Sequence, residues 1–582
     1  MKRKMIKNMI RSSVGSGMAV ALLAVSALFT SCEKILDIDS ELVEFEEDNH
    51  LQNSTDSVYS VMGIIYKMQT IADRTVLLGE LRGDLTTTTA SASADLKALA
   101  SFDINNQENI YNKVSDYYAV INNCNYFLAN INMELEKNGH KVFESEYAVV
   151  KAFRAWTYLQ LAQIYGEVPL VTEPLLTEEA SKNAMNQPRK DIKAICNYFI
   201  DDLKPYVDTK LPTYGEINDR NSQKYFIPVR ALLGDLCLWA GRYQEAAQFY
   251  HDYLALRTDP VRTGVSSVSW SDADTKEFKR IRISLSYRCT GSECLSYIPM
   301  ESNEFYGVKS DLYDLYNSTD LNQGYAKLTP TKQYRDLSAA QNYCIQEMDL
   351  TTIPSTPKDT TYAPKDELAE KEWAGDLRFG GTYNHQTYAQ ERFSRTSNER
   401  QTIDKFDPDG VTLYRTNMVY LRYAEALNRA GYPQAAFAVL KYGLYPDVVA
   451  KQIDSVERAK IGTLVTFDVD LFTIDNTQGI HARGCGDVKC DTLYVLPQPA
   501  SAKASRQDTV DYQIPRVEDM IVTEMALEGA FEGYRYYDLM RVALRRDSTN
   551  YLAEPISKRS GKEDSQLKAL LSNRKNWYLP LP

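Results

Sequence analysis

The sequence predicts a mostly α-helical chain in which a tetratricopeptide-like helical repeat scaffold carries one large loop-rich insertion. Residues 238–247 and 428–436 both read as a helix, an Ala-Gly turn, an aromatic residue and an Ala-rich second helix. The glycine ends the first helix, and small residues let the two helices approach. Tandem repeats follow each other every ~34 residues. The much longer interval here indicates inserted sequence within a single folded body.

Residues 1–31 have the pattern of a bacterial lipoprotein signal peptide. The first residues are basic, and the apolar run over 18–29 is too short to span a bilayer. An A-x-A cleavage site is missing, and small residues lead instead to Cys32, the expected lipidated first residue of the mature chain. The alternative is an ordinary signal peptide followed by an incidental cysteine. Residues 32–50 are acidic and suit a solvated tether.

Composition favours a binding protein and excludes some partners. A net charge of -12 argues against nucleic acid, whose phosphates require a basic surface. The chain has 40 tyrosines, which are rigid amphipathic side chains suited to stacking on ligands. No later apolar run approaches the ~20 residues of a membrane-spanning helix.

The mature chain divides into three regions by pattern. Residues 51–256 are dominated by helical signals, including a helix with Phe153 and Trp156 on one face that stops at Tyr165-Gly166, and another over 228–240. Residues 257–400 are polar and turn-rich, and form the expected ligand-binding insertion. Residues 401–582 contain the second repeat unit.

Cysteine spacing suggests two short-range disulfides in an exported protein. Cys289 with Cys294, and Cys485 with Cys490, each enclose four residues of turn-like sequence. His481 could join the second pair as a zinc ligand, but a fourth ligand is not evident, so a disulfide or two free thiols is the preferred interpretation. The remaining cysteines in helical segments, Cys124, Cys196 and Cys237, are expected to be small core hydrophobes.

Four segments resemble the SusD/RagB family of outer-membrane nutrient-uptake lipoproteins. They are residues 154–170 (RAWTYLQLAQIYGEVPL), 421–428 (LRYAEALN), 532–541 (EGYRYYDLMR) and 577–582 (WYLPLP). The resemblance implies a surface protein that captures an oligosaccharide and delivers it to a SusC-type TonB-dependent transporter, anchored in the outer membrane through its lipid and facing the cell exterior. In an alternative the cargo is an oligopeptide.

Two other function classes compete with this one. A tetratricopeptide scaffold that binds only proteins leaves the aromatic insertion unexplained. A lipid-anchored glycan hydrolase would need catalytic carboxylates that the sequence does not identify, and no G-x-S-x-G, H-E-x-x-H, phosphate-loop or dinucleotide motif is present in the mature chain. We therefore expect no catalytic residues, cofactor or metal. In the 532–541 segment, Glu532, Arg535, Asp538 and Arg541 are expected mainly to pack their helix.

Exposed loop aromatics are the expected ligand contacts, because helix-face residues such as Trp156 and Trp239 suit the core and Trp577 a docked tail. The family's well-known glycan-binding members carry tryptophans in the loop after the first helix, and residues 86–107 here have none. The candidates are Phe102, Asn105 and Asn106 from this early loop, with Trp270, Tyr297, Tyr306 and Trp373 from the insertion.

The lipid anchor predicts that Cys32→Ala releases the protein from membranes. Each buried methylene of an acyl chain contributes roughly 0.8 kcal/mol, and the mature sequence offers no spanning helix in its place. Fractionation of cells producing each form measures the effect. A variant that still sediments quantitatively with the membrane would contradict lipidation at Cys32.

Overall fold

The computed structural model of the chain describes residues 54–581, apart from 104–108, 218, 258–259, 262–287, 303–305, 319–324, 350, 363–374, 389–397, 404, 489 and 502. Cys32 and its tether lie outside the described residues. In the described part of the chain, no helix combines the length and apolar character needed to cross a bilayer.

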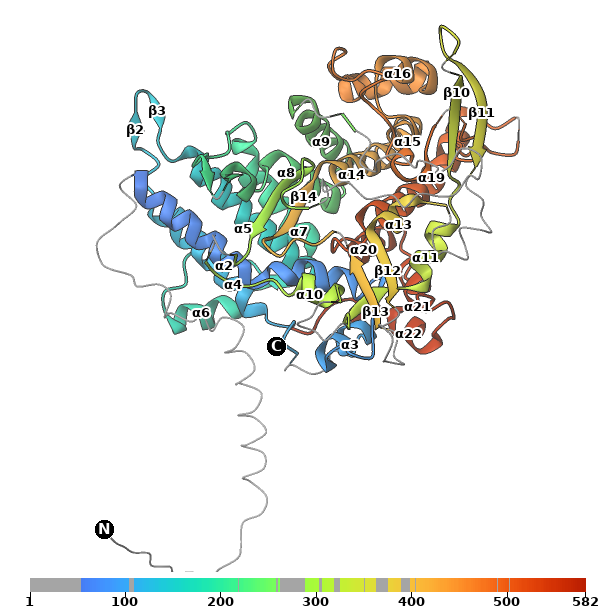
Figure 1. The fold of residues 1–582 in the computed structure, drawn as a ribbon. Helices are drawn as coiled ribbons and strands as arrows, with labels where there is room; N and C mark the ends of the chain where they lie inside the picture. The colour runs from blue at the N-terminus through green and yellow to red at the C-terminus, as the bar shows by residue number, and fades with distance from the viewer. Residues whose placement is uncertain are drawn as a thin grey trace, which may run out of the picture.

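The N-terminal region is an array of helices in which neighbours in sequence are usually neighbours in space, and α2 runs along this array toward α20 (Figure 1). The helix that was predicted to stop at Tyr165-Gly166 is α5, and the helix predicted over 228–240 is α8. The helices are α2 (Ser54–Glu80), α3 (Ala94–Ser101), α4 (Val114–Asn130), α5 (Glu144–Tyr165), α6 (Glu178–Met185), α7 (Ile192–Leu203), α8 (Val229–Ala240) and α9 (Tyr243–Arg257).

Both predicted repeat units are confirmed as helix pairs. Gly241 follows α8 with φ +81°, and Gly431 follows α14 (Thr416–Arg429) with φ +96°, a backbone region that favours glycine. The second helices are α9 and α15 (Pro433–Lys441). Helix α14 packs directly on α9. The two units are therefore consecutive members of one array, and the inserted sequence leaves the array after α9 and returns at α14.

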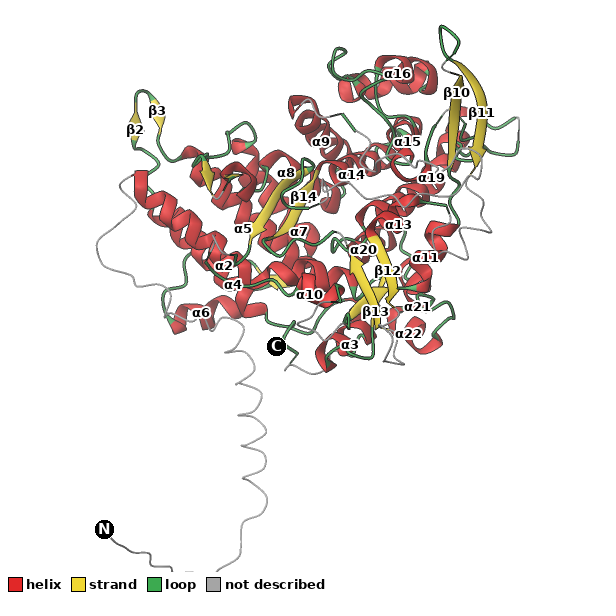
Figure 2. Ribbon diagram, in the orientation of Figure 1, coloured by secondary structure: helices red, strands yellow, loops and turns green. Residues whose placement is uncertain are grey.

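The insertion is more regular than the loop-rich segment we expected. The strands of the described part of the chain are short and scattered among helices (Figure 2), and its sheets have two strands each. The elements between α9 and α14 are β8 (Cys294–Pro299), α10 (Leu312–Tyr316), β9 (Leu328–Pro330), α11 (Lys332–Ala339), β10 (Cys344–Asp349), β11 (Thr356–Tyr362), α13 (Leu377–Thr382), β12 (Tyr383–Tyr388), β13 (Asn398–Ile403) and β14 (Gly410–Arg415).

Antiparallel pairing closes the base of the insertion. Strand β8 pairs with β14, with Val411 opposite Ile298, so that the described start and the end of the insertion lie side by side. Strand β9 pairs with β1 (Thr86–Thr88) of the N-terminal region. The β10–β11 hairpin lies at the upper right of Figure 1, opposite the hairpin of β2 (Glu136–Lys137) and β3 (His140–Lys141) at the upper left. The other two-residue strands are β4 (Val168–Pro169), β5 (Arg189–Lys190), β6 (Glu216–Ile217) and β7 (Arg220–Asn221).

The C-terminal region completes the body and ends in a docked tail. Trp577 is fully buried and its indole N–H donates to the Leu571 carbonyl at 2.7 Å, as expected for a tail residue in the core. After α15 the helices are α16 (Pro446–Gln452), α17 (Ser455–Ile461), α18 (Ala482–Cys485), α19 (Arg506–Gly529), α20 (Arg535–Arg545), α21 (Asn550–Ser557) and α22 (Ser565–Leu571).

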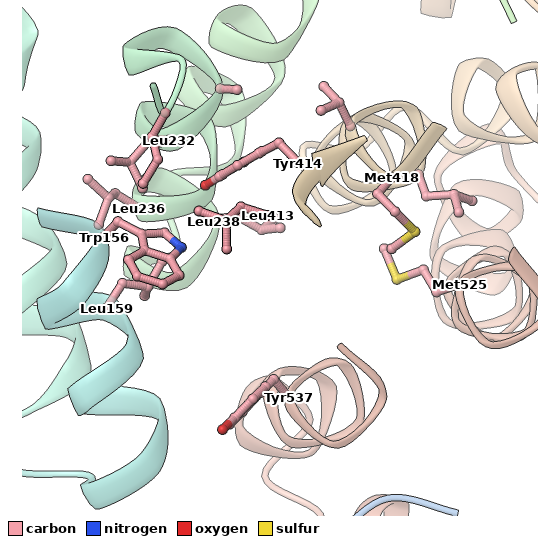
Figure 3. Packing of buried hydrophobic residues seen from close by; sticks show 14 of the residues in the cluster. Trp156, Leu159, Leu232, Leu236, Leu238, Leu413, Tyr414, Met418, Met525 and Tyr537 are labelled. Atoms are coloured by element: carbon pink, nitrogen blue, oxygen red, sulfur yellow. The ribbon is translucent and has the colours of Figure 1, made fainter. Parts of the chain in front are cut away.

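The core is continuous through the three regions. Trp156 is 4 % exposed, as predicted, whereas Trp239 is half-buried and packs against the cluster. In Figure 3, Trp156 and Leu159 lie together at the left, Tyr414 lies above and to their right, and Tyr537 lies below. The side chains of Met418 and Met525 face each other at the right. Between α5, α8, β14 and α20 lies a cavity of about 50 Å³. A water molecule needs about 10–15 Å³ of such volume, so the cavity suits a few waters and no sugar ring.

A buried charge network joins the insertion to α19. The guanidinium groups of Arg378, Arg415 and Arg483 approach the Glu528 carboxylate at 3.1, 2.8 and 3.3 Å, and Arg378 also pairs with Glu524 at 2.8 Å. These side chains are at most 1 % exposed. Burial alone would raise the pKa of Glu528, but the three guanidinium groups hold that pKa well below its ordinary value.

The charged residues of the 532–541 segment also serve packing, as predicted. Most of their partners lie on other elements rather than on their own helix, so they fix α20 and the residues before it against α14 and the segment that follows α2. The pairs are Glu532 with Lys405 at 2.7 Å, Arg535 with Asp84 at 2.6 Å, Arg541 with Glu425 at 2.9 Å, and Arg541 with Asp538 at 2.8 Å within α20.

All eight described cysteines are free and buried, so both of the possible disulfide pairs are present as free thiols. The Cys289 thiol donates to Asp407 at 3.2 Å instead of meeting Cys294. The Cys485 thiol donates to Asp376 at 3.4 Å, on the insertion, and Cys490 faces a different neighbour. Short sequence spacing failed as a guide, because Cys485 is held in the last turn of α18. Cys124, Cys196 and Cys237 are core residues, as expected.

We predict that Arg415→Met lowers the free energy of unfolding by about 3–5 kcal/mol, because it leaves buried carboxylates without their cation. Urea unfolding at neutral pH measures the change. Lys451→Met, which removes an exposed pair with Asp447 within α16, is the matched control and should leave the midpoint unchanged. An Arg415→Met midpoint equal to that of the control would contradict a structural role for the network.

We also predict a pH-dependent effect of Glu80→Gln. Burial raises the pKa of Glu80 to about 7, although hydrogen bonds from the Gly533 and Phe531 amides act to lower it. The folded state binds the proton of the Glu80 carboxyl more tightly than the unfolded state. The contribution of this proton to the free energy of unfolding is therefore complete below the ordinary pKa of glutamate and disappears as the pH rises through 7. Glutamine cannot ionise, so the variant does not lose this contribution. As the pH rises from 5 to 8, its free energy of unfolding should gain about 2–3 kcal/mol relative to that of wild type.

Urea unfolding at several pH values tests this prediction. Exposed Glu179→Gln on α6 is the control and should follow the wild-type profile. Parallel profiles for Glu80→Gln and wild type would show that Glu80 does not titrate in this range.

Candidate ligand-binding site

A solvent-open cavity of about 660 Å³ lies where the ends of α2, α3 and α5 meet the start of α7 and the C-terminal tail. Its volume falls in the range of small-molecule sites, roughly 300–1,000 Å³. The residues that meet here come from both ends of the chain: Asn112 donates to the carbonyl of Pro580 at 3.2 Å beside the cavity. The docked tail is therefore one wall of the cavity.

The floor of the cavity contains a buried cation. Arg82 is 1 % exposed, and its guanidinium group donates to the carbonyls of Leu78 and Trp577 at 2.7 and 3.1 Å and to the Tyr537 hydroxyl at 3.0 Å. The same group lies 4.4 Å from the ring centroid of Tyr536. These neutral partners hold Arg82 in place and satisfy three of the five N–H groups of an arginine.

Tyr165 also lines the cavity. Tyr165, the last residue of α5, is 5 % exposed, and its hydroxyl has no hydrogen-bond partner among the described atoms. Burial raises the pKa of Tyr165 well above its ordinary value, so the phenol stays protonated and able to donate. A buried polar group without a partner costs free energy, about 1–3 kcal/mol, which a bound hydroxyl or carbonyl would recover.

Two aromatic rings border the same space. Phe102 ends α3 with φ +59° and is half-buried, with its ring centroid 5.9 Å from that of Tyr536. The Tyr578 ring packs over Gly166, where a Cβ atom would lie 3.1 Å from it. The exposed mouth carries charged residues of both signs, among them Arg189 and Glu167. Aromatic faces beside fixed hydrogen-bonding groups suit a ligand that is apolar on one face and polar at its edges.

Of the other predicted contacts, the described ones, Tyr297 and Tyr306, do not line this cavity. Asn105, Asn106, Trp270 and Trp373 lie outside the described residues. Tyr297 is 1 % exposed on β8 and packs edge-on against Tyr225 at 5.3 Å, so it is a core residue here. Phe102 lines the cavity as described above.

Tyr306 is 85 % exposed but lies elsewhere along α2. Val308, two residues after Tyr306, is tied to α2, because its amide donates to the Gln69 side chain at 2.9 Å. Thirteen residues of α2 and its end separate Gln69 from Arg82, about 20 Å at 1.5 Å per residue. Tyr306 and Phe102 therefore do not share one cavity.

The insertion nevertheless contacts α2 through residues that we did not predict, close to the segment that precedes α4. Ser310 and the Asp311 amide donate to the Asp73 carboxylate at 2.7 and 2.8 Å. Burial raises the pKa of Asp73 to about 6. Burial and the nearby carboxylates of Asp311 and Asp73 raise the pKa of Tyr111 to about 12, which places the loop at 109–111 beside the same carboxylates.

Comparison with known proteins identifies the fold and a family similarity over part of the chain. Residues 41–206 match the model of a SusD-like family described as "Starch-binding associating with outer membrane". This N-terminal part of the chain is similar to that family. A SusD superfamily protein from Bacteroides vulgatus ATCC 8482 has a TM-score of 0.55 at 16 % identity, over 91 % of this chain and 96 % of that one.

A SusD-like carbohydrate binding protein from Bacteroides fragilis NCTC 9343 has a TM-score of 0.52 at 15 % identity, over 86 % of this chain and 88 % of that one. At such identities the solved structures establish that the chain shares their fold. No curated protein matches the sequence.

Sequence reasoning missed Arg82, Tyr165 and Tyr578 as cavity residues. Tyr165 and Tyr578 belong to segments that carried the family resemblance, in which we had assigned only Trp156 to the core and Trp577 to a docked tail. The signal that could have singled out Arg82 is its position just after a long apolar helix, where a cation is expensive to bury without a purpose. The cavity wall formed by the tail could not be anticipated, because it joins residues hundreds of positions apart.

Proposed function

We propose that this protein is a SusD-like cell-surface binding protein that captures an oligosaccharide and passes it to a SusC-type TonB-dependent transporter. The observation that carries the proposal is the 660 Å³ cavity, in which Phe102 and Tyr578 border a space that Arg82 and Tyr165 also line. The carbohydrate binding named for a solved relative supports a sugar as cargo, and the family description supports association with the outer membrane.

The cavity offers each kind of contact that a sugar needs. The C–H face of a pyranose ring packs on an aromatic ring, while its hydroxyl groups accept from Arg82 and Tyr165 and exchange hydrogen bonds with the charged mouth. A ligand without these hydroxyls would leave buried donors unpaired and bind more weakly. Binding of this kind breaks no covalent bond, so the protein acts by capture rather than by catalysis.

A lipid at Cys32 followed by the acidic tether of residues 32–50 would keep the protein on the outer face of the membrane. Tethering raises the effective concentration of the captured cargo near a transporter in the same membrane, because the second encounter becomes two-dimensional and local. The family resemblance of the four sequence segments supports a SusC-type protein as that transporter.

Calorimetric titration with defined ligands tests the cargo. Suitable probes are maltoheptaose, xylohexaose, an oligogalacturonate and a mixture of random decapeptides. Saturable binding of a saccharide supports the proposal. Binding of the peptides alone would replace the sugar by oligopeptide cargo, and binding of neither, with stable capture of a protein, would favour the scaffold function instead.

We predict that Tyr165→Phe weakens binding of the saccharide identified in that titration by roughly 2- to 10-fold, the value of one neutral hydrogen bond. Thermal stability should not fall, since the lost hydroxyl has no partner in the protein. Tyr117→Phe is the matched control, because the Tyr117 hydroxyl is also buried without a partner but does not line the cavity. Equal affinities for the two variants would place the ligand outside this cavity.

A further inference from the structure

Two cysteines that lie far apart in the sequence come together at the base of the β10–β11 hairpin. The sulfur atoms of Cys344 and Cys490 are 2.9 Å apart, and the residues are 1 % and 6 % exposed. Non-bonded carbon atoms pack at roughly 3.5–4.0 Å, and sulfur is the larger atom. The pair is therefore closer than two unreacted thiols ordinarily pack.

The backbone holds both cysteines in this position. Residue 344, the first of β10, forms an isolated parallel bridge with Gly486, and the Asp487 amide donates to the Cys344 carbonyl at 2.7 Å. The turn then returns toward β10, since the Cys490 amide donates to the Asp487 carbonyl at 3.2 Å. A Cβ atom at Gly486 would lie 2.0 Å from the Cys344 carbonyl oxygen, so this close approach needs glycine.

Cys485 cannot compete for Cys490 in this arrangement. Its thiol donates to the Asp376 carboxylate at 3.4 Å. Cys490 therefore faces Cys344 of the insertion rather than Cys485, its neighbour in sequence.

We propose that Cys344 and Cys490 form a disulfide in the exported protein, fastening the β10–β11 hairpin to the segment between α18 and α19. The reaction removes two protons and two electrons from the two thiols and forms one S–S bond. The electron acceptor is a disulfide-carrying thiol oxidoreductase of the export compartment, whose own S–S bond is reduced to two thiols. The proposal depends on export and is independent of the ligand.

The timing of this reaction follows from the burial of the pair. Burial raises the pKa of both thiols, so the attacking thiolate is scarce once the protein has folded. The exchange therefore takes place while the 485–491 turn is still open, and the closed fold then protects the bond from reductants.

Peptide mapping of the full chain tests the proposal. The protein is exported with its own signal in a Gram-negative host, isolated from the membrane, alkylated under denaturing conditions without reductant and digested. We expect a linked peptide pair containing Cys344 and Cys490, which disappears on reduction, and alkylation of the other six of the eight described cysteines. Full alkylation of Cys344 and Cys490 without reductant would overturn the proposal, as would a Cys485–Cys490 link.

Variants separate the bond from mere packing. Cys344→Ser and Cys490→Ser should each lower the thermal midpoint by several degrees, and the double variant should be no worse than either single one. Cys485→Ser is the control and should retain the link. Additive losses in the double variant, or loss of the link in Cys485→Ser, would contradict the assignment. If a variant fails to fold, the wild-type map still decides the outcome.

Discussion

The single-body fold depends on the carboxylate of Glu528. Three arginines reach it from three separate segments: Arg378 from α13, Arg415 from the end of β14 and Arg483 from α18. Burying so many charges is costly, and the attraction repays that cost only when every partner is in place. The insertion, the return to the repeat array and the C-terminal helices must therefore be correctly placed together, which makes the network a condition for native packing rather than an added contact.

Local sequence patterns predicted the helical part of this fold well. The end of α5, the extent of α8 and the glycine turns of both repeat units follow from short-range signals such as apolar spacing and helix stop residues. These features depend on interactions within a few turns of helix. Local rules are sufficient for them.

Features that depend on distant pairing were less accessible. Tyr297 looked like a loop aromatic, but β8 pairs with a strand over one hundred positions later and this pairing turns its ring into the core. Cys490 was matched with its neighbour in sequence, whereas its spatial neighbour lies in the insertion. Of the candidate contacts, Phe102 alone among the described ones borders the cavity, and the residues that complete the cavity come from the tail and from α2.

The direct packing of α14 on α9 has a consequence for how this protein can change. Because the repeat array is continuous across the insertion, the two points where the chain leaves and re-enters are neighbours, and a longer excursion between them costs little additional closure entropy. Selection could lengthen, shorten or replace much of that excursion while the scaffold stays intact. The inserted residues around Arg378 and Arg415 cannot be replaced in this way, because both arginines pair with Glu528. We therefore expect sequence variation in the insertion to be confined to the residues away from Glu528.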